Sequence, residues 1–306
     1  SRSADKGYPN AVSEIYAREG FINIRLSTSD HVEELKGKEI DEDNKDNFAF
    51  EPIGYIESCF GEKFGTPRQS QYSPYARGSL TLSSKINTDA YEGLEEFSHI
   101  WLIFVFHASH HNKQISKIKL PRLNGRKKGV YATRSPHRFN PIGLSAVQLL
   151  KIVDRTLYLQ GIDLIDGTPI LDIKPYHPAD SIRNFNFPQY ISAPLQLYAV
   201  EFHPYAREQL SRIMSQYTLK FYTHDDNLEE IISNCLGQDP STVHMKLKHS
   251  NQGLYGFSLD KLSIVYVRDS EELKILVVTV EHEEESQGPR ARTELWLEET
   301  TRKLKS

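Results

Sequence analysis

The sequence predicts a mainly β protein in which an antiparallel β-barrel is followed by a small α+β C-terminal domain. From residue 50 onward, short segments of β-type sequence are separated by Gly and Pro, with hardly a helical period among them. Several of these segments are apolar on both faces, above all residues 100–106, which is typical of strands covered on both sides. The seven predicted barrel strands are residues 50–57, 78–83, 97–107, 129–133, 142–153, 156–161 and 170–174.

Helical signals begin at Pro204, which fits the first turn of a helix and precedes the apolar positions Leu210 and Ile213. A second helix, carrying four apolar residues, ends at Gly237. The predicted strands of this C-terminal domain are residues 242–248, 253–258, 261–267 and 273–280.

Four segments follow from these patterns. Residues 1–47 form a polar, weakly ordered extension with a short amphipathic helix near residues 12–24. Residues 48–195 form the barrel, residues 196–280 form the α+β domain, and residues 281–306 form a Glu-rich, frayed tail.

Composition excludes several classes of protein. The chain has 306 residues and no run of 18 apolar residues, so we expect no membrane-spanning helix. Its 17 glycines form neither a G-x-G-x-x-G turn nor a P-loop, which excludes the common nucleotide folds. Cys59 and Cys235 suit neither a disulfide framework nor a zinc knuckle, and we therefore expect an intracellular, cytoplasmic protein, with an organelle left open because the chain begins at Ser.

Charge is distributed unevenly along the chain. Although the net charge is −4, the 57 residues from Phe97 to Val153 contain no Asp or Glu and ten Lys or Arg. Such a segment favours a polyanion, because phosphates are attracted and no carboxylate repels them. The alternative interpretation is a solvated loop surface.

His107, His110 and His111 are spaced closely enough to suggest a metal site. No H-E-x-x-H motif is present, however, and no carboxylate lies near them in sequence. A metal-dependent hydrolase is therefore a weaker hypothesis than a structural or ligand-contacting His107, and we expect no metal.

Polar strings rich in Gly, Pro and Arg lie at the ends of the predicted strands. They are residues 64–69, 132–145 and 161–169, the last followed by residues 171–176. Asp172 and Lys174 are expected to share one face of a strand, since strand side chains alternate with a period of two. Each string alone could be a turn with a surface salt bridge, but three around one barrel favour a ligand site.

These strings, with residues 53–56, 97–101 and 121–123, closely resemble the TsaA/TrmO family of S-adenosylmethionine-dependent tRNA methyltransferases. The resemblance runs from about residue 50 to residue 176 and continues more weakly through Asp239-Pro240 and Leu254-Tyr255. It implies that the barrel, residues 48–195, is the catalytic domain that binds S-adenosylmethionine. It further implies methylation of N6 of threonylcarbamoyl-adenosine at position 37 of a threonine tRNA, and a homodimer with the cofactor near the subunit interface.

The family's cofactor contacts, carried over by resemblance, fall on Pro67, Arg68, Gln69, Phe106, His107, Arg134, Leu144, Asp163, Leu164, Ile165 and Asp166. The target nitrogen must lose a proton, which calls for a general base or a strong acceptor. Asp172 and Tyr176 are the candidates for this acceptor, and Lys174 would balance charge or hold a phosphate. The same three residues could instead brace the site.

The tRNA phosphates are expected on Lys113, Lys117, Lys119, Arg126, Lys127 and Lys128, with the C-terminal domain extending the track. Where the family commonly shows Asp-Pro-Arg, this chain reads Asp239-Pro240-Ser241, which leaves the identity of the tRNA open. A catalytically silent tRNA-binding protein that retained the barrel is the alternative function.

Overall fold

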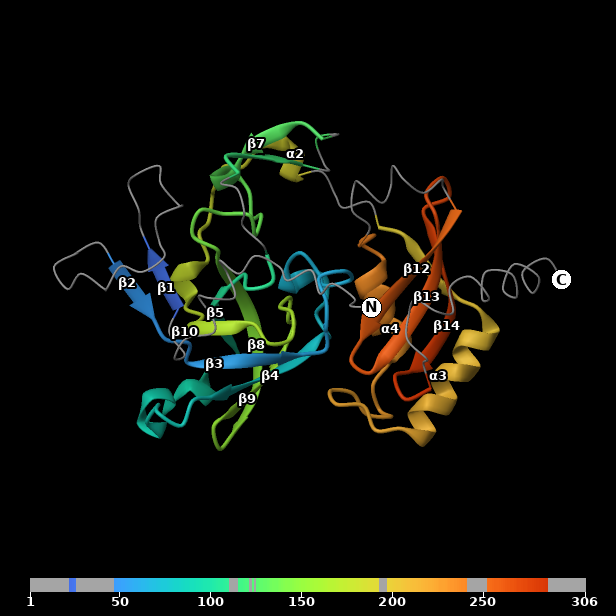
Figure 1. Ribbon diagram of the computed structural model, residues 1–306, viewed down its shortest axis with the longest axis horizontal. Coiled ribbons are helices and arrows are strands. Elements are labelled where there is room, and N and C mark those ends of the chain that lie inside the picture. The colour runs from blue at the N-terminus through green and yellow to red at the C-terminus, as the bar shows by residue number, and fades with distance from the viewer. Residues whose placement is uncertain are drawn as a thin grey trace, which may run out of the picture.

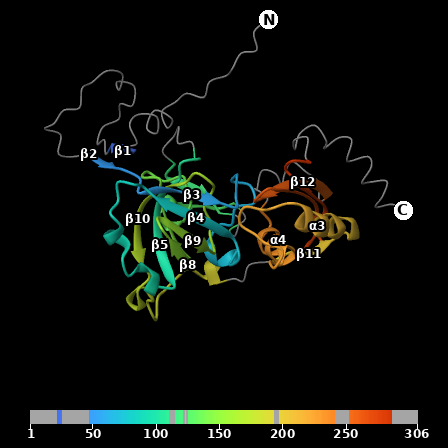
Figure 2. The ribbon, with the colours of Figure 1, turned by 90° about the horizontal axis from the view of Figure 1, so that it is seen from below.

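Two folded parts lie side by side in the computed structural model, which describes residues 22–25, 47–109, 115–120, 123, 125–192, 197–240 and 252–285. Figure 1 shows the barrel on one side and the C-terminal sheet with its helices on the other, and the view from below in Figure 2 agrees. None of the described helices is long and apolar enough to span a membrane.

The first part is a closed barrel of six strands, each paired with antiparallel neighbours, in the order β10-β3-β4-β9-β8-β5. The six strands are β3 (Gly54–Ser58), β4 (Arg77–Leu82), β5 (His99–Val105), β8 (Ile142–Val153), β9 (Thr156–Gln160) and β10 (Pro169–Pro175). The predicted fold class, mainly β with an antiparallel barrel, is confirmed.

Strand β5 shows why its sequence is apolar on both faces. Ile100 and Leu102 are fully buried inside the barrel, whereas Trp101 and Ile103 face outward and are half-buried. Gly143 on β8 lies opposite Phe104, and a Cβ at this position would come within 2.3 Å of the Phe104 ring. The glycine before Leu144 is therefore required by packing inside the barrel.

The predicted strand at residues 129–133 is wrong. The chain there makes a short 3-10 turn, η5 (Val130–Ala132), in which the Thr133 amide donates to the Val130 carbonyl, so an extended strand cannot continue. Just before it, β7 (Lys127–Gly129) pairs with β6 (Lys117–Lys119) in a two-stranded ribbon separate from the barrel sheet.

The N-terminal prediction also needs correction. Strand β1 (Ile22–Arg25) pairs antiparallel with β2 (Asn47–Phe50), so the end of the predicted amphipathic helix near residues 12–24 is extended instead. The predicted strand at residues 50–57 is in fact two strands, because residues 51–53 separate β2 from β3. Residues 12–21 lie outside the described part of the chain.

Short helical turns connect the barrel strands and lead out of the barrel. They are η1 (Ser70–Tyr72), η2 (Thr88–Tyr91), η3 (Leu94–Glu96), η6 (Pro178–Asp180) and α2 (Gln189–Ser192).

The second part is a four-stranded sheet in the order β11-β14-β13-β12, with β11 parallel to β14. Its elements are β11 (Ala199–Phe202), α3 (Pro204–Gln216), α4 (Leu228–Leu236), β12 (Gln252–Leu259), β13 (Leu262–Asp269) and β14 (Lys274–His282). Both helices and the last three strands agree with the sequence prediction. Strand β11 was not predicted, and the predicted strand at residues 242–248 lies outside the described residues.

The expected frayed tail does not begin at residue 281. Strand β14 continues to His282, and both carboxylate oxygens of Glu285 accept hydrogen bonds from Arg212 at 2.6 and 2.7 Å. The Tyr217 hydroxyl donates to the same carboxylate at 2.8 Å. These contacts to α3 and the residue after it hold the chain at least as far as Glu285.

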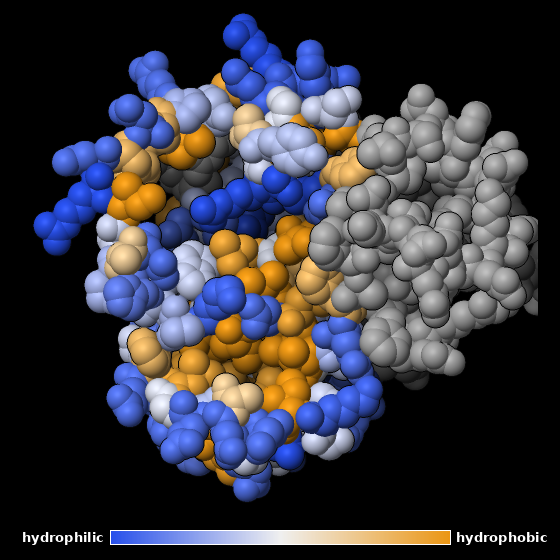
Figure 3. Space-filling model, turned by 90° about the vertical axis from the view of Figure 1, so that its left-hand side faces the viewer, coloured by the Kyte–Doolittle hydropathy of each residue, from blue (hydrophilic) through white to orange (hydrophobic). Residues whose placement is uncertain are grey.

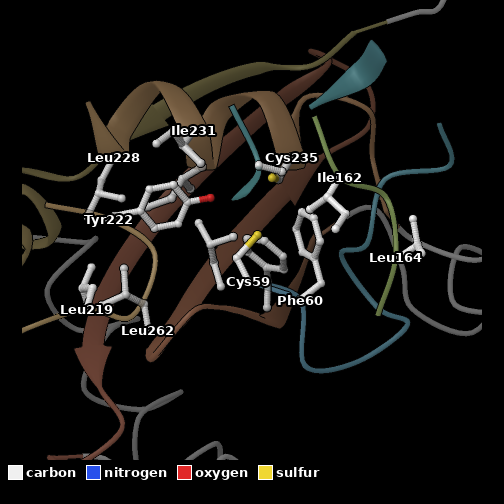
Figure 4. Close-up of a cluster of buried hydrophobic side chains, with 14 of the residues drawn as sticks. Cys59, Phe60, Ile162, Leu164, Leu219, Tyr222, Leu228, Ile231, Cys235 and Leu262 are labelled. Atoms are coloured by element: carbon white, nitrogen blue, oxygen red, sulfur yellow. The ribbon is translucent and has the colours of Figure 1, made fainter. Parts of the chain in front are cut away.

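One hydrophobic core runs through both parts of the molecule. In Figure 4, Cys59 and Phe60 from the barrel lie next to Tyr222 and Cys235 from the C-terminal domain. Both thiols are free and fully buried, and burial raises the pKa of Cys235 to about 12. These cysteines are therefore packing residues rather than nucleophiles.

Candidate active site

Three loops that are far apart in sequence meet at one end of the barrel. The first follows β3 and contains the predicted string at residues 64–69, the second precedes β8, and the third joins β9 to β10. The Arg134 guanidinium of the second loop donates to the Gln69 side-chain oxygen of the first, at 3.3 Å. The structure thus brings together two residues that the sequence predicts as cofactor contacts.

Gly65 shows how the first loop is shaped. Its φ of +89° lies in the left-handed region, and a Cβ would come within 2.0 Å of the Phe257 ring of the C-terminal domain. Only glycine satisfies both conditions. The loop that presents Pro67, Arg68 and Gln69 is therefore packed directly against the second part of the molecule.

Asp163, in the third loop, is the most unusual polar residue of the site. Burial raises the pKa of its carboxyl to about 6, even though hydrogen bonds from the Ser145 side chain and the Ser70 backbone and the nearby positive charge of Arg134 oppose this change. One of its oxygens, Oδ1, is buried without a hydrogen-bond partner in the described structure. A buried carboxylate oxygen of this kind is normally satisfied, so its environment fits a ligand that brings a donor or a positive charge.

Phe106 and His107 follow β5 directly. The Phe106 ring packs edge-on against Phe104, with centroids 5.1 Å apart. His107 is half-buried, and burial is the main cause that lowers the pKa of its imidazole, assisted by the charge of Lys63 and opposed by that of Asp166. Its surroundings favour the neutral ring.

The remaining predicted cofactor contacts differ in how accessible they are. Arg68 and Leu144 are exposed, Pro67 is buried and Ile165 is half-buried. Leu164 is buried in the core, and Asp166 accepts a hydrogen bond from the Ser58 amide at 2.9 Å. Their backbone is engaged as well, because the Leu164 carbonyl accepts from the Ser58 hydroxyl at 2.6 Å and the Asp166 amide donates to the Phe60 carbonyl at 2.8 Å. Leu164 and Asp166 thus hold the loop in shape.

The predicted catalytic residues lie along the end of β10. Lys174 Nζ is 2.8 Å from Asp172 Oδ2, so the two side chains share one face as their spacing predicts. The Tyr176 ring packs against Trp101 with centroids 5.4 Å apart, and the Trp101 indole N–H donates to Asp180 at 2.8 Å.

A pocket of about 430 Å³ opens beside these loops. Its wall includes Tyr176, His99, Gln148 and Gln160, together with Ser70 and Gln71 of the η1 turn that follows Gln69. Of these, the sequence predicted only Tyr176. His99 lies within residues 97–101, which carry the family resemblance, but it was not predicted as a site residue. Gln148 and Gln160 carry no motif signal, since only the register of the barrel brings them together.

The predicted RNA contacts concentrate on the β6–β7 ribbon. Lys119 and Lys127 lie directly opposite each other, and all five described basic residues are exposed. Because side chains alternate, Lys128 belongs to the other face, where its ammonium lies 5.9 Å from the Tyr190 ring centroid. Lys113 lies outside the described residues.

Within the described part of the chain, no three His, Cys, Asp or Glu residues gather as metal ligands would. His110 and His111, which suggested a metal site in the sequence, are not among the described residues.

Comparison with known proteins agrees with this geometry. The family described as "tRNA-methyltransferase O N-terminal domain" matches residues 55–181, which is the barrel from β3 to the η6 turn. A Pseudomonas aeruginosa protein named putative S-adenosylmethionine-dependent methyltransferase RcsF is 42% identical over 220 residues, covering 70% of this chain and 89% of its own. The chain belongs to the TrmO family.

A crystal structure of TrmO from Pseudomonas aeruginosa superimposes with a TM-score of 0.60 at 36% identity, covering 76% of this chain and 98% of its own. The mouse protein named tRNA (adenine(37)-N6)-methyltransferase is 48% identical over 149 residues, which is 48% of this chain. The chain spans only 33% of the length of that mouse protein.

The match to TrmO crystal structures covers far more than residues 55–181, so the likeness continues into the C-terminal domain. The resemblance inferred from the sequence strings is therefore confirmed. The motifs of this TrmO-family chain did not reveal the serines that donate hydrogen bonds to the site carboxylates. Ser70 and Ser145 donate to Asp163, and Ser58 donates to Asp166.

Proposed function

We propose that this protein is a methyltransferase that uses S-adenosylmethionine to methylate N6 of threonylcarbamoyl-adenosine at position 37 of a threonine tRNA. The observation that carries the proposal is the buried, unpartnered oxygen of Asp163 beside the Arg134–Gln69 pair, on a barrel of the TrmO family. Relatives whose names state this type of chemistry support it.

The described residues fit the cofactor. Its amino-acid end carries one carboxylate and one ammonium, and the loops offer the Arg134 guanidinium close to the Asp163 carboxylate. A guanidinium suits a carboxylate, and a buried carboxylate suits an ammonium or a sulfonium. Arg134, Gln69 and Asp163 would hold that end, while Phe106 and Leu144 would cover its apolar parts.

When bound, S-adenosylmethionine supplies an activated methyl group for an in-line displacement. The chain's contribution is alignment and the exclusion of water. Its loops fix the orientation of the donor through Arg134 and Asp163, which hold opposite charges on a rigid barrel end.

At the acceptor side, a group must take the proton that the target nitrogen loses. Asp172 and Tyr176 are our candidates for this acceptor. Lys174 is within ion-pair distance of Asp172, so it would balance the carboxylate or release it to hold a phosphate.

We further propose that tRNA lies along the β6–β7 ribbon. Lys119 and Lys127 face each other directly, and like charges at such positions are unfavourable without a counterion. A phosphate backbone removes this repulsion and releases the bound counterions. Residues Lys113, Lys117, Arg126 and Lys128 would extend the contact.

We also propose a homodimer. The outer side of the barrel exposes apolar side chains, among them Leu144, Leu150 and Tyr158, which are 58%, 45% and 38% exposed. Apolar side chains also form a broad area on the face seen in Figure 3. Contiguous apolar surface of this kind marks interaction sites, and Leu144 would place the interface beside the cofactor. Light scattering at micromolar concentration should give twice the chain mass; a monomer would contradict the proposal.

The function is tested with purified protein, labelled S-adenosylmethionine and two tRNA pools, one with and one without the threonylcarbamoyl group. The expected product is a methylated threonylcarbamoyl-adenosine, found by mass spectrometry in the first pool only. Methyl transfer to adenosine in the pool without the threonylcarbamoyl group would contradict the proposed substrate. Binding of tRNA without any methyl transfer would favour the catalytically silent alternative.

A further inference from the structure

Four polar side chains form a row across four neighbouring barrel strands. The Tyr176 amide, just after β10, donates to the His99 carbonyl on β5 at 3.0 Å. His99 pairs with Gln148 on β8, and Gln148 pairs with Gln160 on β9. The four residues come from positions up to 77 apart in the chain, yet they occupy one continuous row of the barrel.

The row faces outward. The neighbours of these residues on each strand, Ile100, Val147 and Leu159, are at most 1% exposed and fill the barrel interior. Since strand side chains alternate, His99, Gln148 and Gln160 must lie on the outer face, where they line the pocket of about 430 Å³.

The lining of this pocket combines uncharged polar side chains with apolar surface and carries no carboxylate, lysine or arginine. It is therefore suited to a neutral ligand with hydrogen-bonding edges rather than to the charged amino-acid end of a cofactor. The charged groups of the site, Arg134 and Asp163, are not part of the lining.

The side chains match a purine. Gln148 and Gln160 are joined by one hydrogen bond of 3.3 Å, which leaves each amide with further donors or acceptors for a ligand. Glutamine amides read the edge of adenine through paired hydrogen bonds. Tyr176, packed against Trp101, supplies an aromatic surface of the kind on which unstacked RNA bases lie.

The pocket adjoins the residues proposed to hold the methyl donor. Ser70 in its lining follows Gln69, and Gly161 precedes Asp163 by two positions. On β8, Ala146 in the lining is two residues from Leu144 on the same face, a distance of about 7 Å along a strand. A ring in the pocket would thus lie close to the donor.

We infer that this pocket receives the adenine ring of the nucleoside to be methylated, extruded from the anticodon loop, and that Gln148 and Gln160 recognise its edge. The inference rests on the proposed function. Enzymes that modify a base take it out of the stack into such a pocket. Tyr176 would then contact the substrate directly.

The first test does not depend on methyl transfer. The protein is first saturated with S-adenosylhomocysteine, so that the cofactor site is filled. It is then titrated with adenosine, and binding is followed by saturation-transfer NMR. Saturable binding of adenosine is expected for the wild-type protein and for Gln216→Leu, a matched change on an exposed glutamine at the end of α3. It should be lost in Gln160→Leu. Absence of saturable binding in the wild type would overturn the inference.

The second test separates substrate from cofactor. Gln160→Leu should lower kcat/KM for tRNA by about ten- to hundredfold and leave the Kd for S-adenosylhomocysteine within about twofold of wild type. A similar loss of affinity for S-adenosylhomocysteine would assign the pocket to the cofactor's own adenine and overturn the inference. If the wild-type protein methylates no tRNA, the proposed function fails, while the adenosine titration still decides what the pocket binds.

Discussion

At the scale of single residues, the proposed cofactor site depends most on Asp163. Its carboxyl is held in a buried position by Ser145 and Ser70, and one oxygen remains without a partner. Holding a charge there costs free energy in the free protein, and a cationic ligand recovers it on binding.

This arrangement predicts pH-dependent cofactor binding. The pKa of Asp163 is about 6, so the carboxylate is present above that pH and is lost as the pH falls through it. Affinity for S-adenosylmethionine, measured by calorimetry from pH 5 to 8, should therefore fall below about pH 6. Asp163→Asn should bind weakly at every pH and lose most of the dependence; an unchanged profile in this variant would assign the titration to another group, such as His107.

The same residue predicts a trade-off with stability. A folded-state pKa of about 6 lies above the ordinary value of 3.8, so the folded protein binds the proton more tightly and its stability falls as pH rises from about 4 to 6. Two pKa units correspond to about 3 kcal/mol as an upper bound. In thermal unfolding without cofactor at pH 7.5, Asp163→Asn should be at least as stable as wild type. A clearly lower Tm would mean that the charged carboxylate contributes to the fold.

At this scale, residues in recognisable motifs could be predicted from the sequence, whereas residues brought together only by strand register could not. Arg134, Gln69 and Asp163 stand in strings that are recognisable in one dimension. Gln148 and Gln160 do not, because an isolated glutamine in a strand has no signature until the pairing of the strands is known. The unpartnered oxygen of Asp163 likewise depends on burial, which no spacing in the sequence reveals.

At the scale of elements, β-type segments separated by Gly and Pro located the six barrel strands, whereas the strand predicted at residues 129–133, next to the basic ribbon, was wrong. Residues 129–133 look like a strand because Val130 and Tyr131 are β-type residues, but the chain turns there and the strand ends at Gly129. The β propensity of Val130 and Tyr131 is therefore overridden by the turn that leads to the Arg134 loop.

The ribbon leads to a prediction about salt. Each lysine that contacts a phosphate contributes a little under one unit to the slope of log affinity against log salt. Lys119→Gln with Lys127→Gln should therefore weaken tRNA binding and lower the slope by almost two units, while the Kd for S-adenosylmethionine stays unchanged. Lys85→Gln, an exposed lysine paired with Glu51, is the matched control. Wild-type affinity and slope in the double variant would move the RNA track elsewhere.

At the scale of the whole molecule, the C-terminal domain binds the segment that follows the loop of Gln69. Gln238 donates to the Tyr72 carbonyl at 2.6 Å, and the Ser73 hydroxyl lies 3.3 Å from Cys235 Sγ. Arg77 makes a bidentate pair with Asp226 at 2.6 and 2.9 Å. The sequence predicted two domains; the contacts that join them were beyond it, because they depend on how two finished folds meet.

The last prediction is that these two parts unfold as one cooperative unit. Their shared core and the Arg77–Asp226 pair mean that neither part can expose its interface without losing buried contacts of the other. Calorimetry should show a single transition, shifted to higher temperature by S-adenosylmethionine as a whole, because a ligand of the barrel then stabilises both parts.

Asp226→Asn removes a charge from a pair whose side chains are 30% and 14% exposed, and should cost about 1–3 kcal/mol while keeping one transition. Glu285→Gln breaks an equally short Arg–Glu pair inside the C-terminal domain, at 43% and 23% exposure, and should cost less stability because water screens it more.

The two variants should also differ in their affinity for the cofactor. With its hold on Arg77 weakened, the loop of Gln69 samples more arrangements, so Asp226→Asn should reduce affinity for S-adenosylmethionine and Glu285→Gln should not. Two separate transitions in the wild type, or equal effects of both variants on affinity, would contradict this coupling between the C-terminal domain and the loop.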